Sequence, residues 1–126
     1  MAVNIFVYGT LLQGGSNHHI LQAGEGRGPV PAALEDYALY QVTPWYPGIV
    51  PKPGRKVLGE VYEVSPELLT RLDRLEGVDV GLYRRELATV KTDDGRQIEA
   101  FVYVWNSGTN GAREVPLKKQ PWGKES

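Results

Sequence analysis

Two apolar runs far apart in the sequence predict the strands at the centre of the fold. Val3 to Tyr8 is β-branched or aromatic at every position except Asn4, so the run is apolar on both faces. Phe101 to Trp105 has the same character near the other end of the chain. Strands with this pattern are buried on two sides. We therefore expect both runs to lie in one central sheet or barrel.

Weaker patterns between these runs predict the remaining strands. The stretch from Val30 to Val42 indicates an irregular strand region, and Val57 to Val64 alternates with a period of two. Lys52 to Lys56 carries charges, proline and glycine, and we expect a loop there. Gly81 to Thr92 is expected to form a strand that returns through the turn Asp93-Asp94-Gly95, a combination typical of a β-hairpin.

One helix is predicted after the third strand region. Ser65 is a good N-terminal cap, and Pro66 suits the first helical position. Gly77 follows the last helical residue, where glycine commonly ends a helix. We expect the helix to cover the barrel with an apolar stripe that consists of Leu68, Leu69, Leu72 and Leu75.

A carboxylate lies within that apolar stripe. Successive residues turn by about 100° around a helix, which places Glu76 between Leu72 and Leu69. A charge at a core-facing helix end either reaches water as the helix unwinds or is held there for a purpose. The pattern favours neither explanation. Asp73 lies at the rim of the same side, and we expect it to be solvated.

The first strand ends at a glycine that opens a loop. Gly9 stops the run, and Thr10 and Leu11 lead through Gly14-Gly15 towards a short helix predicted at Asn17 to Ala23. Backbone N–H groups that leave a strand without ladder partners suit an anion or an oxygen that gains negative charge. An ordinary strand-to-helix turn is the commoner explanation of such a pattern.

The composition excludes several kinds of chemistry. The chain has 126 residues, a formal net charge of −1 and no cysteine. Near-neutral charge disfavours nucleic acid and membrane as partners, and the lack of cysteine excludes disulfides and thiolate sites. His18 and His19 are adjacent, so a helix would point them about 100° apart, and we expect surface residues rather than metal ligands. No stretch resembles a signal or membrane segment, which makes a cytoplasmic protein the expectation.

These elements predict one domain followed by a tail. Strands outnumber helices and turns are short, which favours a small closed or nearly closed β-barrel with one covering helix. The predicted domain comprises residues 1–106. Residues 107–126 are rich in glycine, proline and lysine and lack periodicity, so we expect an extended or partly ordered tail with Lys118 and Lys119 in solvent.

Several short motifs occur in a set order along the chain. They are Phe6-Val7-Tyr8-Gly9-Thr10-Leu11, Gly59-Glu60-Val61-Tyr62, Leu72-Asp73-Arg74-Leu75-Glu76-Gly77, Leu82-Tyr83-Arg84-Arg85 and Phe101-Val102-Tyr103. In this order they resemble the γ-glutamylcyclotransferase-like family, also called AIG2-like. Their spacing is most similar to the branch that acts on γ-glutamylamines. The tail carries nothing that matches.

The resemblance implies both a fold and a site. The fold is α+β, a small mixed β-barrel with one main covering helix, a short helix after the first strand and a cavity at one end. Glu76 is implied as the acid–base residue, and the backbone of Tyr8, Gly9, Thr10 and Leu11 as the binding site for a γ-glutamyl group. Tyr83 follows after a short loop and is expected to position Glu76 or the substrate, with a core aromatic as the alternative. No metal or organic cofactor is implied, and the oligomeric state stays open.

The implied reaction suits these residue types. The α-amine of a γ-glutamyl amine or peptide attacks its own γ-carbonyl, which gives 5-oxoproline and a free amine without an enzyme nucleophile. One glutamate can serve both proton transfers if burial raises its pKa towards neutrality. The alternative is a non-catalytic module on the same barrel that binds a small ligand or a partner, since fold does not determine function. An oligonucleotide-binding barrel is disfavoured by the near-neutral charge.

Overall fold

The two apolar runs lie side by side as parallel strands. In a computed structural model, which describes residues 3–12 and 27–122, strand β1 (Val3–Val7) pairs with β5 (Gln97–Trp105). Ile5 and Val7 belong to one buried apolar cluster, and Phe6 belongs to a second cluster on the other side of the sheet. The prediction that both runs share one central sheet, buried on two faces, is confirmed.

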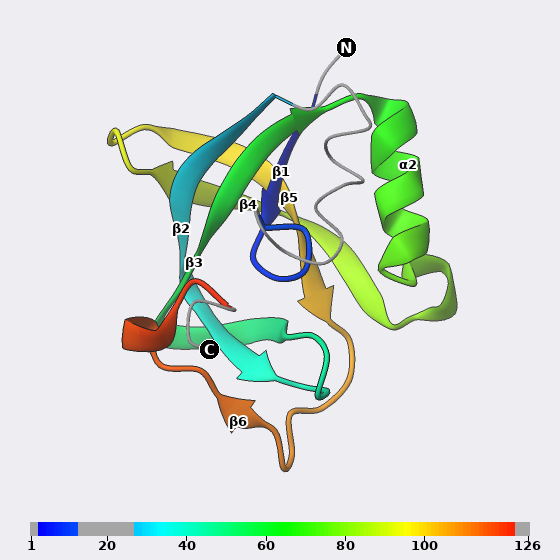
Figure 1. The fold of residues 1–126 in the computed structure, drawn as a ribbon, viewed down its shortest axis with the longest axis vertical. Coiled ribbons are helices and arrows are strands. Elements are labelled where there is room, and N and C mark those ends of the chain that lie inside the picture. The colour runs from blue at the N-terminus through cyan, green and yellow to red at the C-terminus, as the bar shows by residue number, and fades with distance from the viewer. Residues whose placement is uncertain (1–2, 13–26, 123–126) are drawn as a thin grey trace.

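Five strands close into a barrel around this pair. β3 (Gly48–Val64) pairs with β1, β4 (Tyr83–Thr92) pairs with β5, and β2 (Arg27–Gln41) joins β4 back to β3. Among the described strands β1 and β5 are parallel and their other pairings antiparallel, so the barrel is mixed (Figure 1). The predicted fold class is confirmed. The short helix predicted after the first strand lies outside the described residues.

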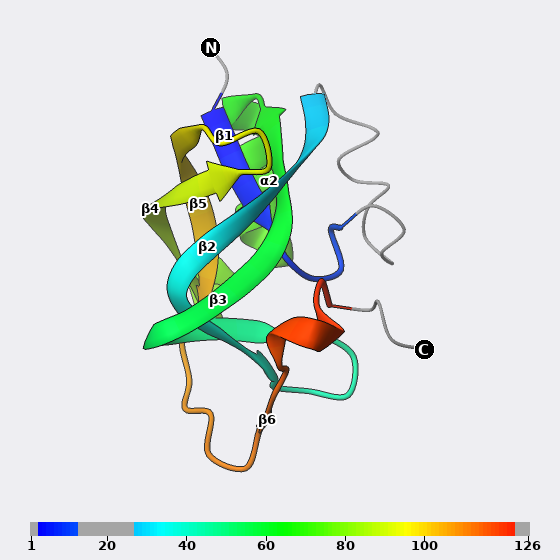
Figure 2. The same cartoon turned by 90° about the vertical axis from the view of Figure 1, so that its left-hand side faces the viewer.

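The strands β2 and β3 form a long curved ribbon along one side of the barrel (Figure 2). The prediction of a loop at Lys52 to Lys56 is wrong, because these residues lie within the continuous strand β3. A register shift between Glu35 and Tyr37 in the pairing of β2 with β3 accommodates this stretch. There Asp36 has a φ of 66° and Gly54 a φ of 83°, and the Gly54 N–H donates to the Asp36 carboxylate at 3.1 Å. This bulge lets a proline- and glycine-containing stretch stay in the sheet.

Helix α2 (Pro66–Leu75) covers one face of the barrel (Figure 1). Its start follows the predicted cap, since Ser65 Oγ accepts a hydrogen bond from the Leu68 N–H at 3.1 Å. Its end follows the predicted stop, since Gly77 has a φ of 68°, a conformation that favours glycine. Within the described residues no helix has the length and hydropathy needed to cross a membrane.

The face of α2 that meets the barrel is narrower than predicted. Leu68, Leu69 and Leu72 are buried in the cluster that contains Ile5. Leu75 is 38% exposed, so its assignment to the core is wrong. It belongs to the last turn of the helix, where its side chain lines a pocket instead.

The segment after β5 folds back onto the barrel. β6 (Arg113–Glu114) pairs with the end of β2, and a short 3-10 helix, η2 (Leu117–Lys119), follows it. The side chain of Gln120 is buried and hydrogen-bonded to the backbone of Leu58. We expected a tail after residue 106, and its described part, residues 107–122, is held to the sheet by these contacts. Lys118 and Lys119 are exposed, as expected.

Candidate active site

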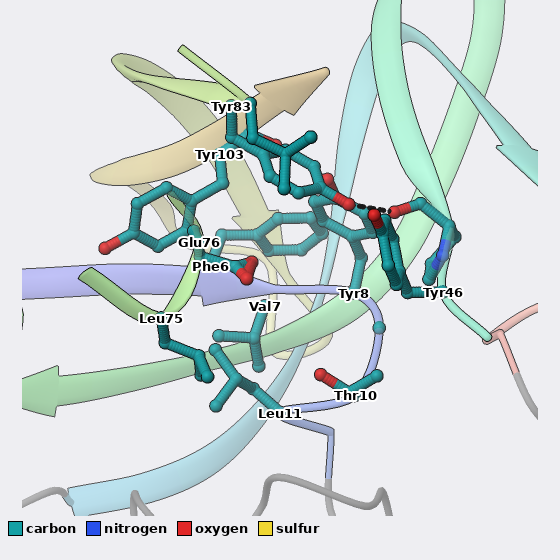
Figure 3. A pocket seen from close by; sticks show the side chains of 13 residues that line it. Phe6, Val7, Tyr8, Thr10, Leu11, Tyr46, Leu75, Glu76, Tyr83 and Tyr103 are labelled. Carbon is teal, nitrogen blue, oxygen red and sulfur yellow. Dashed lines mark hydrogen bonds between the residues drawn. The ribbon is translucent and has the colours of Figure 1, made fainter. Parts of the chain in front are cut away.

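A pocket of about 210 Å³ opens where β1 leaves the barrel beside the end of α2 (Figure 3). The chain turns sharply at this point, because the Leu12 N–H donates to the Gly9 carbonyl at 3.0 Å. Leu11 and Leu12 are buried and fix the turn to the core. The pocket is lined by Phe6, Val7, Tyr8, Gly9, Thr10, Leu11, Tyr46, Pro47, Leu75, Glu76, Leu82, Tyr83 and Tyr103.

The structure brings together every residue that the sequence singled out for the site. These are Tyr8, Gly9, Thr10, Leu11, Glu76 and Tyr83. The pocket is also lined by Tyr46, Pro47 and Tyr103, which were not predicted, and the two tyrosines add to its aromatic lining. The alternation along β5 could have indicated Tyr103, because residues two apart on a strand share a face. Trp105 packs on the same side of the sheet as Tyr103.

Glu76 enters the pocket from the end of its helix. It is the C-terminal cap of α2, and its backbone N–H still donates to the Leu72 carbonyl at 2.9 Å, so the residue is fixed by the last turn. Gly77 then diverts the chain into the 3-10 helix η1 (Val78–Val80). Burial raises the pKa of the Glu76 carboxyl from 4.5 to about 7. Among the described residues none gives its carboxylate a hydrogen bond or an ion pair.

Three tyrosines surround Glu76, and each donates its hydroxyl proton elsewhere. Tyr8 donates to the Tyr103 carbonyl at 2.7 Å, and Tyr83 donates to the Pro47 carbonyl at 2.5 Å (Figure 3). Tyr103 donates to the Asp73 carboxylate at 2.7 Å. Burial raises the pKa of all three hydroxyls well above the usual range, and the nearby charge of Glu76 adds to that effect.

The bond from Tyr83 fixes one wall of the pocket. Thr43 Oγ1 accepts hydrogen bonds from the N–H groups of Trp45 and Tyr46, each at 3.1 Å, which shapes the turn before Pro47. The Tyr46 and Tyr83 rings lie 6.3 Å apart, and the Tyr83 ring packs edge-on against another aromatic of the core, Trp105. The wall is therefore rigid and apolar, apart from the tyrosine oxygens.

Gly9 lies so close to Pro47 that position 9 has no room for a side chain. A Cβ placed there would lie 3.0 Å from ring carbons of Pro47, which is tighter than most real contacts. The close approach of loop and proline narrows the pocket around Glu76. Glycine allows this close approach because it has no Cβ.

Asp73 is not the solvated rim residue that we expected. Its carboxylate accepts hydrogen bonds from the Tyr103 hydroxyl at 2.7 Å and from an Arg85 guanidinium nitrogen at 2.7 Å. Both partners are far away in sequence, on β5 and β4, so periodicity along the helix could not reveal them. Asp73 therefore joins α2 to the barrel wall one turn before Glu76.

Nothing in the described ranges points to a metal centre. No group of three or more histidine, aspartate and glutamate side chains within residues 3–12 and 27–122 could hold a metal ion. His18 and His19, expected at the surface, lie outside the described residues. The acid–base chemistry available in the described pocket is that of Glu76 and the tyrosine hydroxyls.

Fold and pocket define a class of protein: a small mixed barrel with an end pocket built around one acid. The sequence model of the family described as gamma-glutamyl cyclotransferase, AIG2-like, matches residues 5–124. The chain belongs to this family.

Individual relatives agree with the family. A putative gamma-glutamylcyclotransferase of Vibrio cholerae is 43% identical over 101 residues, 80% of each chain. The gamma-glutamylaminecyclotransferase of Mus musculus is 34% identical over 119 residues, 80% of this chain and 76% of the mouse protein. A crystal structure of a mouse AIG2-like protein superposes with a TM-score of 0.71 at 26% identity and covers 94% of this chain and 99% of that one.

Proposed function

We propose that this protein is a cyclotransferase that converts a γ-glutamyl amine or γ-glutamyl peptide into 5-oxoproline and a free amine. The observation that carries the proposal is Glu76, a carboxyl whose burial raises its pKa to about 7 inside the pocket. A group with this pKa is present in both protonation states near neutral pH, so it can accept and return a proton in one turnover.

The proposed reaction needs no nucleophile from the protein. The α-nitrogen of the substrate forms a bond with the γ-carbonyl carbon, and the bond from that carbon to the leaving nitrogen breaks. Glu76 takes the proton that the α-nitrogen loses and delivers it to the leaving nitrogen, so the proton count balances. The pocket holds the chain in the ring-closing geometry, which supplies the proximity that such a reaction requires.

The pocket walls fit the two ends of such a substrate. At about 210 Å³ the pocket is smaller than the ~300–1,000 Å³ typical of sites for drug-sized ligands, which suits a γ-glutamyl head with its amine at the mouth. We assign the backbone of Gly9, Thr10 and Leu11 to the γ-glutamyl group. Tyr8 and Tyr83 offer oxygen lone pairs, because their protons are already donated to carbonyl groups.

A panel of γ-glutamyl amines and γ-glutamyl dipeptides tests this proposal. We expect 5-oxoproline release, measured by chromatography, from at least one member of the panel at neutral pH, and release that is roughly 10²–10⁴-fold slower with Glu76→Gln as the matched control. The family resemblance alone also fits a binding module on the same barrel. Tight binding of the panel by calorimetry without any 5-oxoproline from the wild type would establish that alternative. The half-buried carboxylate argues against it, because a desolvated acid without a partner among the described residues lowers stability and gives a scaffold no benefit.

A further inference from the structure

Asp73 holds the helix that carries Glu76 against two strands of the barrel. Its two carboxylate oxygens contact different partners: Oδ1 accepts from the Tyr103 hydroxyl and Oδ2 from Arg85, each at 2.7 Å. The Arg85 guanidinium also lies over the Phe101 ring, 4.7 Å from its centre, so the cation is itself held in place. A two-oxygen contact of this kind fixes both the position and the rotation of the last turn of α2.

The bond to Tyr103 fixes a wall of the pocket as well as the helix. Tyr103 lines the pocket beside Glu76, and its hydroxyl points away from the Glu76 carboxylate (Figure 3). A phenol has one proton to donate, and Tyr103 donates it to Asp73. Tyr8 and Tyr83 are occupied in the same way by backbone carbonyls, which no substitution can remove.

We propose that Asp73 is a positioning residue for Glu76: it accepts the hydrogen bond of the Tyr103 hydroxyl and pins the last turn of α2 to β4 and β5. The carboxylate of Glu76 then faces the pocket without a hydrogen-bond donor from the described barrel wall. The proposal rests on the proposed function of Glu76, and Asp73 itself does not line the pocket. It acts through Tyr103 and through the helix end.

The sign of the effect on the pKa of Glu76 follows from its surroundings. The titratable groups that face it in the described pocket are tyrosines: Tyr8 just after β1, Tyr83 from β4, Tyr103 from β5, and Tyr46 from the turn before β3. Asp73→Ala removes both contacts that hold the last turn of α2, so the carboxyl of Glu76 gains access to water. Because burial is what raises the pKa of Glu76, this change favours the ionised form and lowers the pKa.

The test compares kcat, KM and the pH profile of wild type and Asp73→Ala, with 5-oxoproline release as the assay. We expect kcat to fall by about 10- to 100-fold, because a small misplacement of a reacting group has effects of this size. KM should change little, and the acid limb of the kcat/KM profile should move to lower pH. Asp73→Asn keeps an oxygen for the Tyr103 hydroxyl and should recover part of kcat. A folded Asp73→Ala protein with wild-type kcat and an unmoved acid limb would overturn the proposal.

Three further measurements separate the role of Asp73 from the proposed function of Glu76. Asp94→Asn makes the same chemical change as Asp73→Asn at an exposed hairpin carboxylate paired with Arg96, and it should leave kcat and the pH profile unchanged.

Carboxyl NMR titration of Glu76 without substrate should show a pKa near 7 in the wild type and a lower one in Asp73→Ala. That titration stays informative if no substrate is turned over, and an unchanged Glu76 pKa in Asp73→Ala would refute the role of Asp73 by itself. In a Tyr103→Phe background, Asp73→Asn should move the acid limb less than it does alone.

Discussion

Two polar side chains lie in apolar surroundings on different sides of the barrel, and the fold treats them in opposite ways. Gln120 is 3% exposed and uses its whole amide: its oxygen accepts from the Leu58 N–H at 2.8 Å, and its nitrogen donates to the Lys56 and Val115 carbonyls at 3.2 Å. Glu76 has no hydrogen-bond or ion-pair partner among the described residues, although three tyrosines surround it.

We infer from this difference that Gln120 stabilises the fold, whereas Glu76 is kept reactive. A buried amide with every partner in place contributes to stability and fixes the segment that carries it. A desolvated carboxylate without donors destabilises the folded state, and its pKa shifts towards the pH at which proton transfer is fastest. Substitutions should therefore affect the two sites in opposite ways: activity at Glu76 and stability at Gln120.

The largest effect is expected from Glu76→Gln. Glutamine keeps the shape of the side chain and removes the exchangeable proton, so kcat should fall by roughly 10²–10⁴-fold. The measurement is 5-oxoproline release on the best γ-glutamyl substrate, with circular dichroism to show that the variant is folded. Equal rates in wild type and Glu76→Gln would show that Glu76 is only a helix-end residue. The contrast between Glu76 and Gln120 would then no longer be one of function against stability.

The stability of the same variant should depend on pH. Between the ordinary pKa of 4.5 and the raised value of about 7, the folded chain keeps a proton on Glu76 that the unfolded chain has lost. The folded state binds more protons in this window, so the contribution of Glu76 to stability falls as pH rises and stays low above pH 7. Glu76→Gln lacks this penalty, which amounts to at most about 3.4 kcal/mol. Urea unfolding at pH 4 and pH 8 should show the variant level with wild type at pH 4 and more stable at pH 8; a difference that shrinks with pH would contradict the assignment.

The sequence predicted elements whose signals lie within a few residues. The cap, the first turn and the stop of α2 are all local, and Glu76 could be placed because a helical wheel needs only its own helix. The strands β1 and β5 were predicted from composition, since apolar runs on both faces fit only a central position. The pocket could be located because the glycine that ends β1 and the glutamate that ends α2 both occur in recognisable motifs.

The contacts that complete the site were not predictable from one sequence. Asp73 meets Arg85 across 12 residues and Tyr103 across 30, and neither pairing leaves a periodic trace. Gln120 meets Leu58 across 62 residues, so a segment rich in lysine and proline gave no sign of a buried amide. Such pairs depend on strand register, which only the folded chain reveals.

A smaller effect is expected from Gln120→Leu. Leucine has a similar volume, so the change leaves the Leu58 N–H and two carbonyls without partners rather than opening a cavity. We expect a loss of about 1–3 kcal/mol in the free energy of unfolding, measured by urea titration. Gln97→Leu, at an exposed position of β5, is the matched control and should change stability by less than about 0.5 kcal/mol. The Gln120→Leu protein should keep wild-type kcat below its unfolding range, and a selective loss of kcat would blur the distinction between the two sites.

The smallest effect, and the closest test of how separate the two regions are, is expected from Trp122→Phe. The Trp122 indole N–H donates to the Gln41 side-chain oxygen at 2.8 Å, and the Gln41 nitrogen donates to the Thr43 carbonyl at 2.6 Å. Thr43 shapes the turn that carries Tyr46 into the pocket wall, so this chain of bonds links the C-terminal segment to the site.

Phenylalanine keeps an aromatic ring at position 122, removes the N–H and gives up part of the contact of the indole with the two apolar clusters. The loss should be about 0.5–1.5 kcal/mol, because the Gln41 oxygen is only partly buried and water can replace the donor. If Tyr83 and the Thr43 turn are sufficient to hold the wall, kcat and KM for 5-oxoproline release will be unchanged. A rise in KM of several-fold at unchanged kcat would show instead that the C-terminal segment sets the shape of the pocket, and the two regions would then have to be treated as one.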